Sequence, residues 1–205
     1  MKDLDSLIDA IIIDRVLKSR HIIEAFEKVD RADFVPDMFK EAAYVDAPLG
    51  IGENQTISQP TTVAFMLEQL SPQKGDKILD IGAGSGWTTA MLCHIVGDEG
   101  SVLGLERIDS LVELGKFNLA RYCPDETRCR IEKAGERLGV PGKKFDKILV
   151  SAAADELPEE LIDQLNVGGK LVIPVRDSIE VVTKTSEEEY QRESIYGFRF
   201  VPLVY

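Results

Sequence analysis

Hydrophobic residues recur along the chain at two different spacings, and each spacing predicts a different kind of element. Within residues 3–29, apolar positions follow the spacing of two amphipathic helices that cover one flank of the core. A further helix is predicted over residues 61–70, because Pro60 suits the start of a helix. Residues 34–52 are interrupted by prolines and glycines and lack strand alternation, which predicts a short helix within an extended connection.

From residue 77 onward, short apolar strands alternate with helical patterns, which is typical of an α/β fold. Strands are predicted over residues 77–81, 101–106, 128–133, 145–151 and 170–175, and helices over 86–97, 109–121 and 159–165. Residues 178–185 and 190–196 flank an acidic stretch and predict a hairpin, and residues 198–205 are expected to add a terminal strand. The pattern therefore predicts a doubly wound, mostly parallel sheet with antiparallel edge strands and N-terminal helices.

Composition and charge narrow the classes of protein. The chain has 205 residues, of which 44% are hydrophobic and 29% charged, as expected of one globular domain. The formal net charge of −12 argues against a nucleic-acid partner, because phosphate binding needs clustered Lys and Arg. The longest apolar run, residues 63–67, is far too short for a membrane span, so we expect a cytoplasmic protein without a membrane partner.

Cysteines and histidines offer little for catalysis or metal binding. Cys93, Cys123 and Cys129 are odd in number and lack C-x-x-C spacing, so the sequence predicts separate thiols and supports neither a disulfide framework nor a zinc site. His21 and His94 both lie within helical patterns. A Ser-His-Asp triad and a histidine metal site are therefore not expected.

A glycine loop follows the first strand of the α/β region and indicates a nucleotide-cofactor site. Gly82, Gly84 and Gly86 remove Cβ atoms where the backbone turns tightly and a ligand approaches, and the helix that follows directs its N-terminal amides at that ligand. Glu106 lies twenty residues later, at the end of the next strand, where its carboxylate can accept hydrogen bonds from a ribose diol.

The spacing within the loop discriminates between cofactors. Dinucleotide sites carry G-x-G-x-x-G, whereas this chain has G-x-G-x-G preceded by Asp80, which is typical of S-adenosylmethionine sites. S-adenosylmethionine is therefore favoured over NAD. A strand-to-helix turn that binds nothing is the structural alternative, and the register of Glu106 with the loop argues against it.

A second motif lies just before the cofactor strand and is more specific than the glycine loop. Residues 52–60 read G-E-N-Q-T-I-S-Q-P, and together with the loop they closely resemble the protein-L-isoaspartate (D-aspartate) O-methyltransferase family. Further matches extend the resemblance over essentially the whole chain: D-F-V-P at 33–36, A-Y-V-D-A-P at 43–48, A-A-A at 152–154, L-I-D-Q-L at 161–165, G-G-K-L-V-I-P-V at 168–175 and F-V-P-L at 200–203. The resemblance implies a Rossmann-like class I S-adenosylmethionine-dependent methyltransferase fold.

The resemblance also implies a reaction, substrates and site residues. The expected reaction is methylation of the α-carboxylate of isoaspartyl residues in damaged proteins or peptides, which starts their repair, and D-aspartyl residues are a further candidate substrate. Ser58 matches the active-site serine of the family and is also expected at the cofactor. The other expected cofactor residues are Thr56, Ile57, Asp80, Gly82, Gly84, Ser85, Gly86, Glu106, Gly135 and Glu136. We expect a monomer with one domain, in which residues 1–60 form a helical, substrate-side segment and residues 61–205 form the cofactor-binding core.

The chain departs from the family pattern at three places. Ala134-Gly135-Glu136 stands where the family usually has Gly-Asp-Gly, so the adenine-side aspartate falls on Gly135 or, with a one-residue slip, on Glu136. Asp155 and Gly50 each replace a usual proline. These changes leave three alternatives: a carboxyl methyltransferase for a dedicated peptide partner, a non-catalytic cofactor-binding module, and an NAD-linked oxidoreductase. The intact T-I-S segment argues against the second, and the loop spacing against the third.

Overall fold

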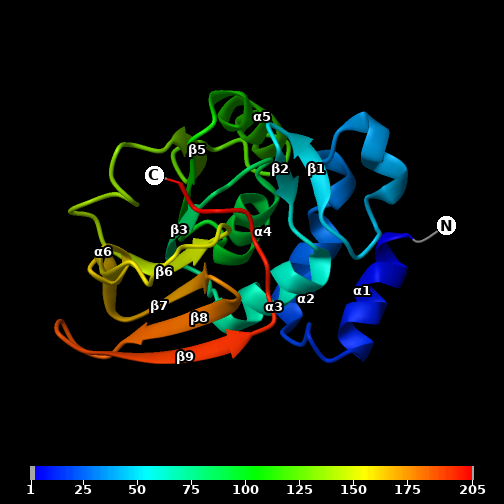
Figure 1. The fold of residues 1–205 in the computed structure, drawn as a ribbon. Coiled ribbons are helices and arrows are strands. Elements are labelled where there is room, and N and C mark those ends of the chain that lie inside the picture. The colour runs from blue at the N-terminus through cyan, green and yellow to red at the C-terminus, as the bar shows by residue number, and fades with distance from the viewer. Residues whose placement is uncertain (1–2, 205) are drawn as a thin grey trace.

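Helices dominate the first 70 residues and alternate with strands after them in the computed structural model of the chain, which describes residues 3–204 (Figure 1). The helices are α1 (Leu4–Ile13), α2 (Arg20–Lys28), the 3-10 helices η1 (Arg31–Phe34) and η2 (Asp37–Ala42), α3 (Pro60–Leu70), α4 (Trp87–Val96), α5 (Asp109–Leu119) and α6 (Glu159–Ile162). The strands are β1 (Leu49–Gly52), β2 (Gln55–Ile57), β3 (Lys77–Ile81), β4 (Ser101–Glu106), β5 (Cys129–Lys133), β6 (Phe145–Val150), β7 (Leu165–Val175), β8 (Ser178–Lys184) and β9 (Tyr190–Tyr196).

Seven of these strands form one sheet in the order β5-β4-β3-β6-β7-β8-β9. The pairs from β5 to β7 are parallel, whereas β8 pairs antiparallel with both β7 and β9. The order reverses at β3, which lies between β4 and β6, and ligands of such sheets bind beyond the carboxyl ends of the strands at this switch point. The predicted doubly wound sheet with an antiparallel edge is confirmed.

Alternating side chains of the strands build two hydrophobic clusters, one on each face of the sheet. On β3, Ile78 belongs to the cluster covered by α1 to α5, and its neighbour Leu79 belongs to the cluster on the opposite face. Residues of α6 and of the loops after β5 and β6 cover that second face. The alternation has a polar exception at Asp80, which lies on β3 and is fully buried.

The connection after η2 contains a hairpin that the sequence analysis missed. Strands β1 and β2 pair antiparallel and form a two-stranded sheet of their own. They are joined by Glu53 and Asn54, whose φ angles of 53° and 56° match the left-handed turn that a two-residue hairpin needs. Strands of four and three residues are too short to show alternation, and only Asn54 is a residue that favours this turn.

Residues 198–204 do not form the predicted terminal strand, and Tyr205 lies outside the described residues. The segment instead crosses the carboxyl ends of the central strands, where Pro202 forms an isolated parallel bridge with Ala153. The bridge consists of two hydrogen bonds, from the Ala153 N–H to the Val201 carbonyl and from the Leu203 N–H to the Ala153 carbonyl, both at 2.8 Å. Helix α6 is likewise shorter than predicted, because β7 already begins at Leu165.

The prediction of separate thiols is wrong for two of the three cysteines. Cys93 on α4 and Cys129 on β5 form a disulfide, although 36 residues separate them in the sequence. Cys123 is free and buried, and the three sulfur atoms lie within 4.8 Å of one another. Cysteine number and C-x-x-C spacing could not reveal this pair, because helix packing against the sheet brings the residues together.

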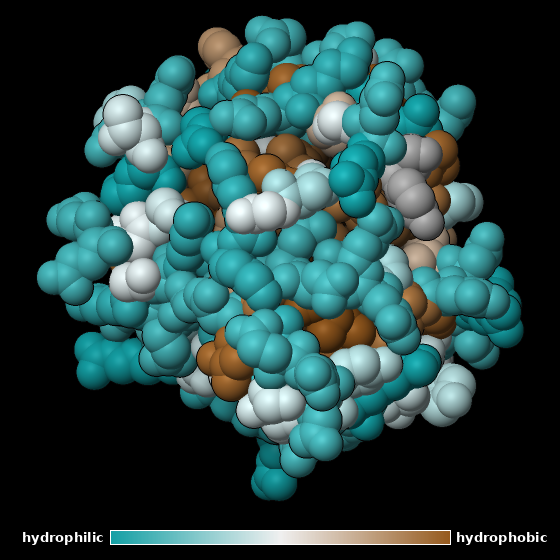
Figure 2. Space-filling model, turned by 90° about the vertical axis from the view of Figure 1, so that its left-hand side faces the viewer, coloured by the Kyte–Doolittle hydropathy of each residue, from teal (hydrophilic) through white to brown (hydrophobic). Residues whose placement is uncertain are grey.

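The face on the left of Figure 1 is mostly hydrophilic, and hydrophobic residues are visible in recesses between the polar ones (Figure 2). No helix within residues 3–204 combines the length and the apolar character that crossing a membrane requires.

Candidate active site

The loop between β3 and α4 adopts a backbone that favours glycine at three positions. Gly82, Gly84 and Gly86 have φ angles of 81°, 54° and 91°, which residues with a Cβ rarely adopt. A Cβ on Gly86 would also lie only 3.0 Å from the carbonyl oxygen of Gly115 on α5. Glycine at this position therefore allows the loop to pack against α5.

Glu106 at the end of β4 fastens this loop to the next strand. Its Oε2 atom accepts a hydrogen bond from the backbone N–H of Gly84 at 3.0 Å. Its Oε1 atom accepts from the N–H groups of Arg107 and Ile108, at 2.7 and 3.0 Å. An ionised carboxylate has about four acceptor sites, so these bonds leave capacity for a ligand hydroxyl.

Asp80 lies beneath the loop and holds the start of α4. Its Oδ2 atom accepts from the hydroxyl groups of Thr88 and Thr89, at 2.8 and 2.6 Å. Complete burial raises the pKa of Asp80 to about 6, the two threonine hydrogen bonds oppose this shift, and the charge of Glu106 adds to it. The positive N-terminal end of the α4 dipole stabilises the ionised form of Asp80, whereas removing this carboxylate from water destabilises it.

This raised pKa predicts a pH-dependent effect of the substitution Asp80→Asn. Folded Asp80 holds its proton up to about pH 6, whereas the group titrates near 3.8 in its ordinary environment. Ionisation of Asp80 therefore lowers the free energy of unfolding. The decrease is negligible below about pH 4 and reaches up to about 3 kcal/mol above about pH 6. The free energy of unfolding of Asp80→Asn, relative to that of the natural chain, should rise by about this amount between pH 4 and pH 7 in urea titrations.

The exposed Asp125 offers a control with the opposite sign, because hydrogen bonds from Thr127 lower its pKa. The free energy of unfolding of Asp125→Asn, relative to that of the natural chain, should therefore fall slightly between pH 4 and pH 7. An Asp80→Asn difference that is the same at pH 4 and pH 7 would contradict the burial argument.

The β1–β2 hairpin forms the opposite wall of the site. Thr56 and Ile57 lie on β2, and Ser58 follows directly before helix α3. At the tip of the hairpin, a carboxylate oxygen of Glu53 accepts a hydrogen bond from the Ser110 hydroxyl at 2.9 Å, on the first turn of α5. This contact connects the hairpin to the side of the site that carries Glu106.

The hairpin, the glycine loop and the ends of the central strands enclose a pocket of about 1050 Å³, part of which is open to solvent. Eight of the residues predicted from the sequence line it: Thr56, Ile57, Ser58, Gly82, Gly84, Ser85, Glu106 and Gly135. Asp80, Gly86 and Glu136 are not among its lining residues. Asp80 accepts hydrogen bonds from Thr88 and Thr89 at the start of α4, Gly86 packs against Gly115 of α5, and Glu136 is exposed on the loop after β5. Cofactor contacts of all eleven predicted residues stay predictions.

Several lining residues were not predicted from the sequence. Trp87 is buried and also lines the pocket. Ser151 and Ala152 follow β6, and residues 201–204 of the C-terminal segment complete the wall. The A-A-A and F-V-P-L motifs were the only signals for these positions. Of the other departures from the family pattern, Asp155 lies outside this pocket and Gly50 lies on β1.

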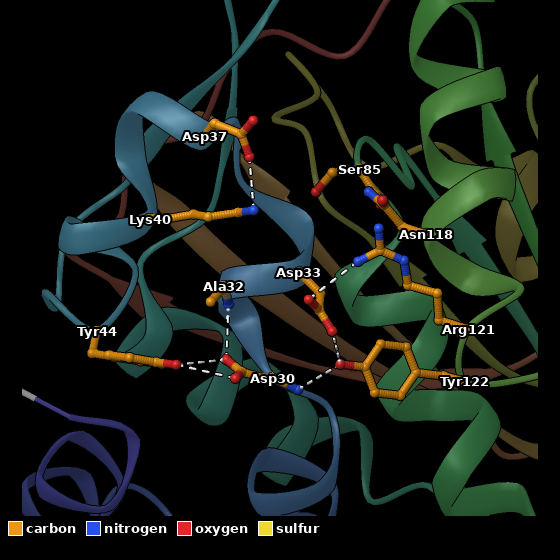
Figure 3. Close-up of polar contacts among 10 residues, drawn as sticks. All are labelled: Asp30, Ala32, Asp33, Asp37, Lys40, Tyr44, Ser85, Asn118, Arg121 and Tyr122. Atoms are coloured by element: carbon orange, nitrogen blue, oxygen red, sulfur yellow. Dashed lines mark hydrogen bonds and ion pairs between the residues drawn. The ribbon is translucent and has the colours of Figure 1, made fainter.

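A polar network fixes η1 against residues that directly follow α5 and η2 (Figure 3). The Asp30 carboxylate accepts hydrogen bonds from the Tyr44 hydroxyl at 3.0 Å, and the Tyr122 hydroxyl donates to Asp33 at 2.7 Å. Arg121 forms an ion pair with Asp33 at 3.1 Å. Burial and the neighbouring Asp30 raise the pKa of Tyr44 to about 12, so this tyrosine remains a donor at neutral pH.

The lining of the pocket fits S-adenosylmethionine chemically. The glycine loop allows a ligand to approach the backbone closely, and Glu106 supplies acceptors suited to ribose hydroxyls. Apolar side chains of Leu105, Ile108 and Leu138 are suited to a planar base. When bound, the cofactor would supply an electrophilic methyl group.

The seven-stranded sheet, the G-x-G-x-G loop after β3 and the acidic residue at the end of β4 define a class I S-adenosylmethionine-dependent methyltransferase. The family model described as protein-L-isoaspartate(D-aspartate) O-methyltransferase matches residues 2–205. The chain belongs to this family.

Individual relatives agree over nearly the whole chain. The protein-L-isoaspartate O-methyltransferase of Methanopyrus kandleri is 41% identical over 192 residues, which are 92% of this chain and 85% of that protein. The protein of the same name from Ignicoccus hospitalis is 38% identical over 97% of this chain and 95% of its own length. A crystal structure of a candidate protein-L-isoaspartate O-methyltransferase from Plasmodium falciparum, in complex with S-adenosyl-L-homocysteine, is 26% identical. It superposes with a TM-score of 0.87 over 100% of this chain and 99% of that chain.

Proposed function

We propose that this chain transfers the methyl group of S-adenosylmethionine to the α-carboxylate of L-isoaspartyl residues in proteins and peptides. The observation that carries this proposal is the position of Ser58 in the same pocket as the glycine loop and Glu106. A cofactor bound by the glycine loop and a substrate carboxylate bound by Ser58 would thus lie in the same pocket. The net charge of −12 supports a peptide substrate over a nucleic acid.

The reaction needs no strong base. The substrate carboxylate, with a pKa of roughly 3.5, is ionised at neutral pH and is itself the nucleophile. One of its oxygen atoms forms a bond to the methyl carbon while the bond from that carbon to sulfur breaks, and the electron pair remains on sulfur. The protein therefore contributes alignment, which brings the reacting atoms to roughly 3 to 3.5 Å, and the exclusion of water from an anion and a cation.

We assign to Ser58 the role of orienting the substrate carboxylate. Ser58 lines the pocket, where its hydroxyl group can donate to a substrate oxygen. Its backbone carbonyl is held from the opposite side by Arg31, at 3.1 Å. Ser58 thus presents its side chain from a fixed backbone position.

The proposal is tested by transfer of labelled methyl to an isoaspartyl peptide, beside its aspartyl twin and a sample without peptide. We expect label on the isoaspartyl peptide alone, released by mild base as methanol. Cofactor binding without transfer would contradict the proposal and favour a dedicated peptide partner. A D-aspartyl peptide in the same assay tests the expected D-aspartyl activity. Light scattering in the same buffer tests whether the protein is a monomer, as expected.

Replacing Ser58 by alanine should lower kcat by about 10- to 100-fold, because a hydrogen bond to a charged group contributes roughly 1.5 to 3 kcal/mol. The dissociation constant for S-adenosylmethionine should change little, since the glycine loop and Glu106 remain. Steady-state kinetics and calorimetry measure the two quantities. Ser71→Ala, at the other end of α3, is the matched control and should leave both unchanged. Loss of cofactor binding in Ser58→Ala would refute the assigned role.

A further inference from the structure

Within residues 3–204, Arg31 is the largest side chain that is completely buried, and its hydrogen bonds converge on residues 43–58. It is 0% exposed and lies on η1. Its Nη1 atom donates to the carbonyl oxygens of Ala43 and Val45, at 2.7 and 3.2 Å. Its Nη2 atom donates to those of Ala47 and Ser58, at 2.9 and 3.1 Å. One guanidinium group therefore joins both ends of residues 43–58.

The same guanidinium contacts the cofactor side of the site. Its Cζ atom lies 5.5 Å from the ring centroid of Trp87, within the range of a cation–π interaction. Trp87 is the first residue of α4, directly after the glycine loop, and it lines the pocket. Its Nε1 atom is in turn fixed by a hydrogen bond to the Val29 carbonyl at 3.2 Å. Arg31 thus lies between the segment that carries Ser58 and the loop expected to bind the cofactor.

Charge and anchoring keep Arg31 in this position. Burial lowers its pKa to about 10 despite the attraction of the Asp46 carboxylate, so the group is charged at neutral pH. Asp46 accepts hydrogen bonds from the Gln59 side chain and from the Thr61 N–H and hydroxyl groups, which fixes the chain just after Ser58. The network of Figure 3 holds the neighbours of Arg31 on η1.

We infer that Arg31 is a positioning residue for methyl transfer, which sets Ser58 at the correct place relative to the cofactor loop. This inference rests on the proposed function, in which Ser58 orients the substrate carboxylate. Arg31 does not line the pocket and therefore acts through the Ser58 backbone. No chemistry is assigned to the guanidinium itself.

The substitution Arg31→Lys tests the inference because it keeps the charge and removes the fork of donors. A lysine ammonium is a single point and cannot serve both the Ala43–Val45 and the Ala47–Ser58 pairs of carbonyl groups. We expect kcat to fall about tenfold or more, since a misplacement of about 1 Å can cost about a hundredfold. The dissociation constant for the cofactor should stay within about threefold of its natural value. Rates are normalised to the cofactor-binding stoichiometry, so that unfolded protein is not counted.

Arg128→Lys is the matched control. Arg128 also donates to two backbone carbonyls, of Gly97 at 2.6 Å and of Cys93 at 3.4 Å, but it lies outside the pocket. Its replacement should lower the melting temperature without the selective loss of kcat. Equal losses of kcat in the two variants, at equal stability, would show that Arg31 has only a structural role and would overturn the inference.

Hydrogen exchange separates this inference from the proposed function. In Arg31→Lys, the amides of residues 55–59 should exchange at least about tenfold faster than in the natural chain, and in Arg128→Lys they should not. Unchanged exchange overturns the positioning role even if methylation is confirmed, and faster exchange supports it even if the natural chain methylates another carboxylate. If Arg31→Lys does not fold, Asp46→Asn provides the second variant. It should accelerate exchange of the same amides, and exchange at the natural rate would overturn the inference.

Discussion

Replacing Glu106 by alanine should raise the dissociation constant for S-adenosylmethionine by several hundredfold. The substitution removes the acceptor proposed for the ribose hydroxyls and leaves the N–H groups of Gly84, Arg107 and Ile108 without their partner. Hydrogen bonds to charged groups contribute roughly 1.5 to 3 kcal/mol each, so losing the ligand contact and the fixed loop together costs about 3 to 4 kcal/mol of binding. Isothermal titration calorimetry measures the change directly.

The neighbouring strand provides the control for this experiment. Glu132 on β5 pairs in register with Leu105, is exposed and does not line the pocket. Glu132→Ala should bind the cofactor as the natural chain does. If Glu106→Ala also keeps its affinity while its fold is intact by circular dichroism, the ribose is not recognised at the end of β4.

Reducing the Cys93–Cys129 disulfide should lower the melting temperature by about 10 °C. The bond closes a loop with a sequence separation of 36 residues, for which the chain-entropy relation gives roughly 4 kcal/mol. Unfolding entropies of chains of this size convert that free energy into roughly 10 °C. Thermal melts followed by circular dichroism, with and without a dithiol reductant, provide the measurement.

Two variants check the origin of this shift. The double variant Cys93→Ala/Cys123→Ala leaves no partner for Cys129 among the three clustered thiols, and its melting temperature should be low and insensitive to the reductant. Cys123→Ala retains the bond and should respond to the reductant as the natural chain does. A natural chain whose melting temperature ignores the reductant would contradict a stabilising role of the disulfide.

The parts of the site that the sequence predicted are those determined by neighbours in the chain. The G-x-G-x-G loop requires a local backbone conformation that favours glycine at three positions, and Glu106 follows one strand–helix–strand unit later. Strands β3 and β4 were also predicted from local sequence, because a buried parallel strand appears as a short apolar run. Ser58 was predicted from the resemblance of residues 52–60 to the family motif. The local pattern alone predicted only an extended connection there.

The missed features depend on contacts between residues far apart in the sequence. Arg31 donates to carbonyl groups up to 27 residues away, and no local pattern marks a buried arginine. The Cys93–Cys129 pair and the C-terminal wall of the pocket arise in the same way, from the packing of α4 on β5 and from the bridge of Pro202 with Ala153. Sequence periodicity identifies elements, whereas these contacts depend on how the elements are assembled.

The hydrogen bond between Glu53 and Ser110 is not the main support of the β1–β2 hairpin. It is a single exposed hydrogen bond and contributes only about 1 kcal/mol. Ile51 and Ile57, one from each strand of the hairpin, are buried in the hydrophobic core. The wall of the pocket that carries Thr56 is therefore anchored mainly by apolar packing, so weakening the core would also loosen the site.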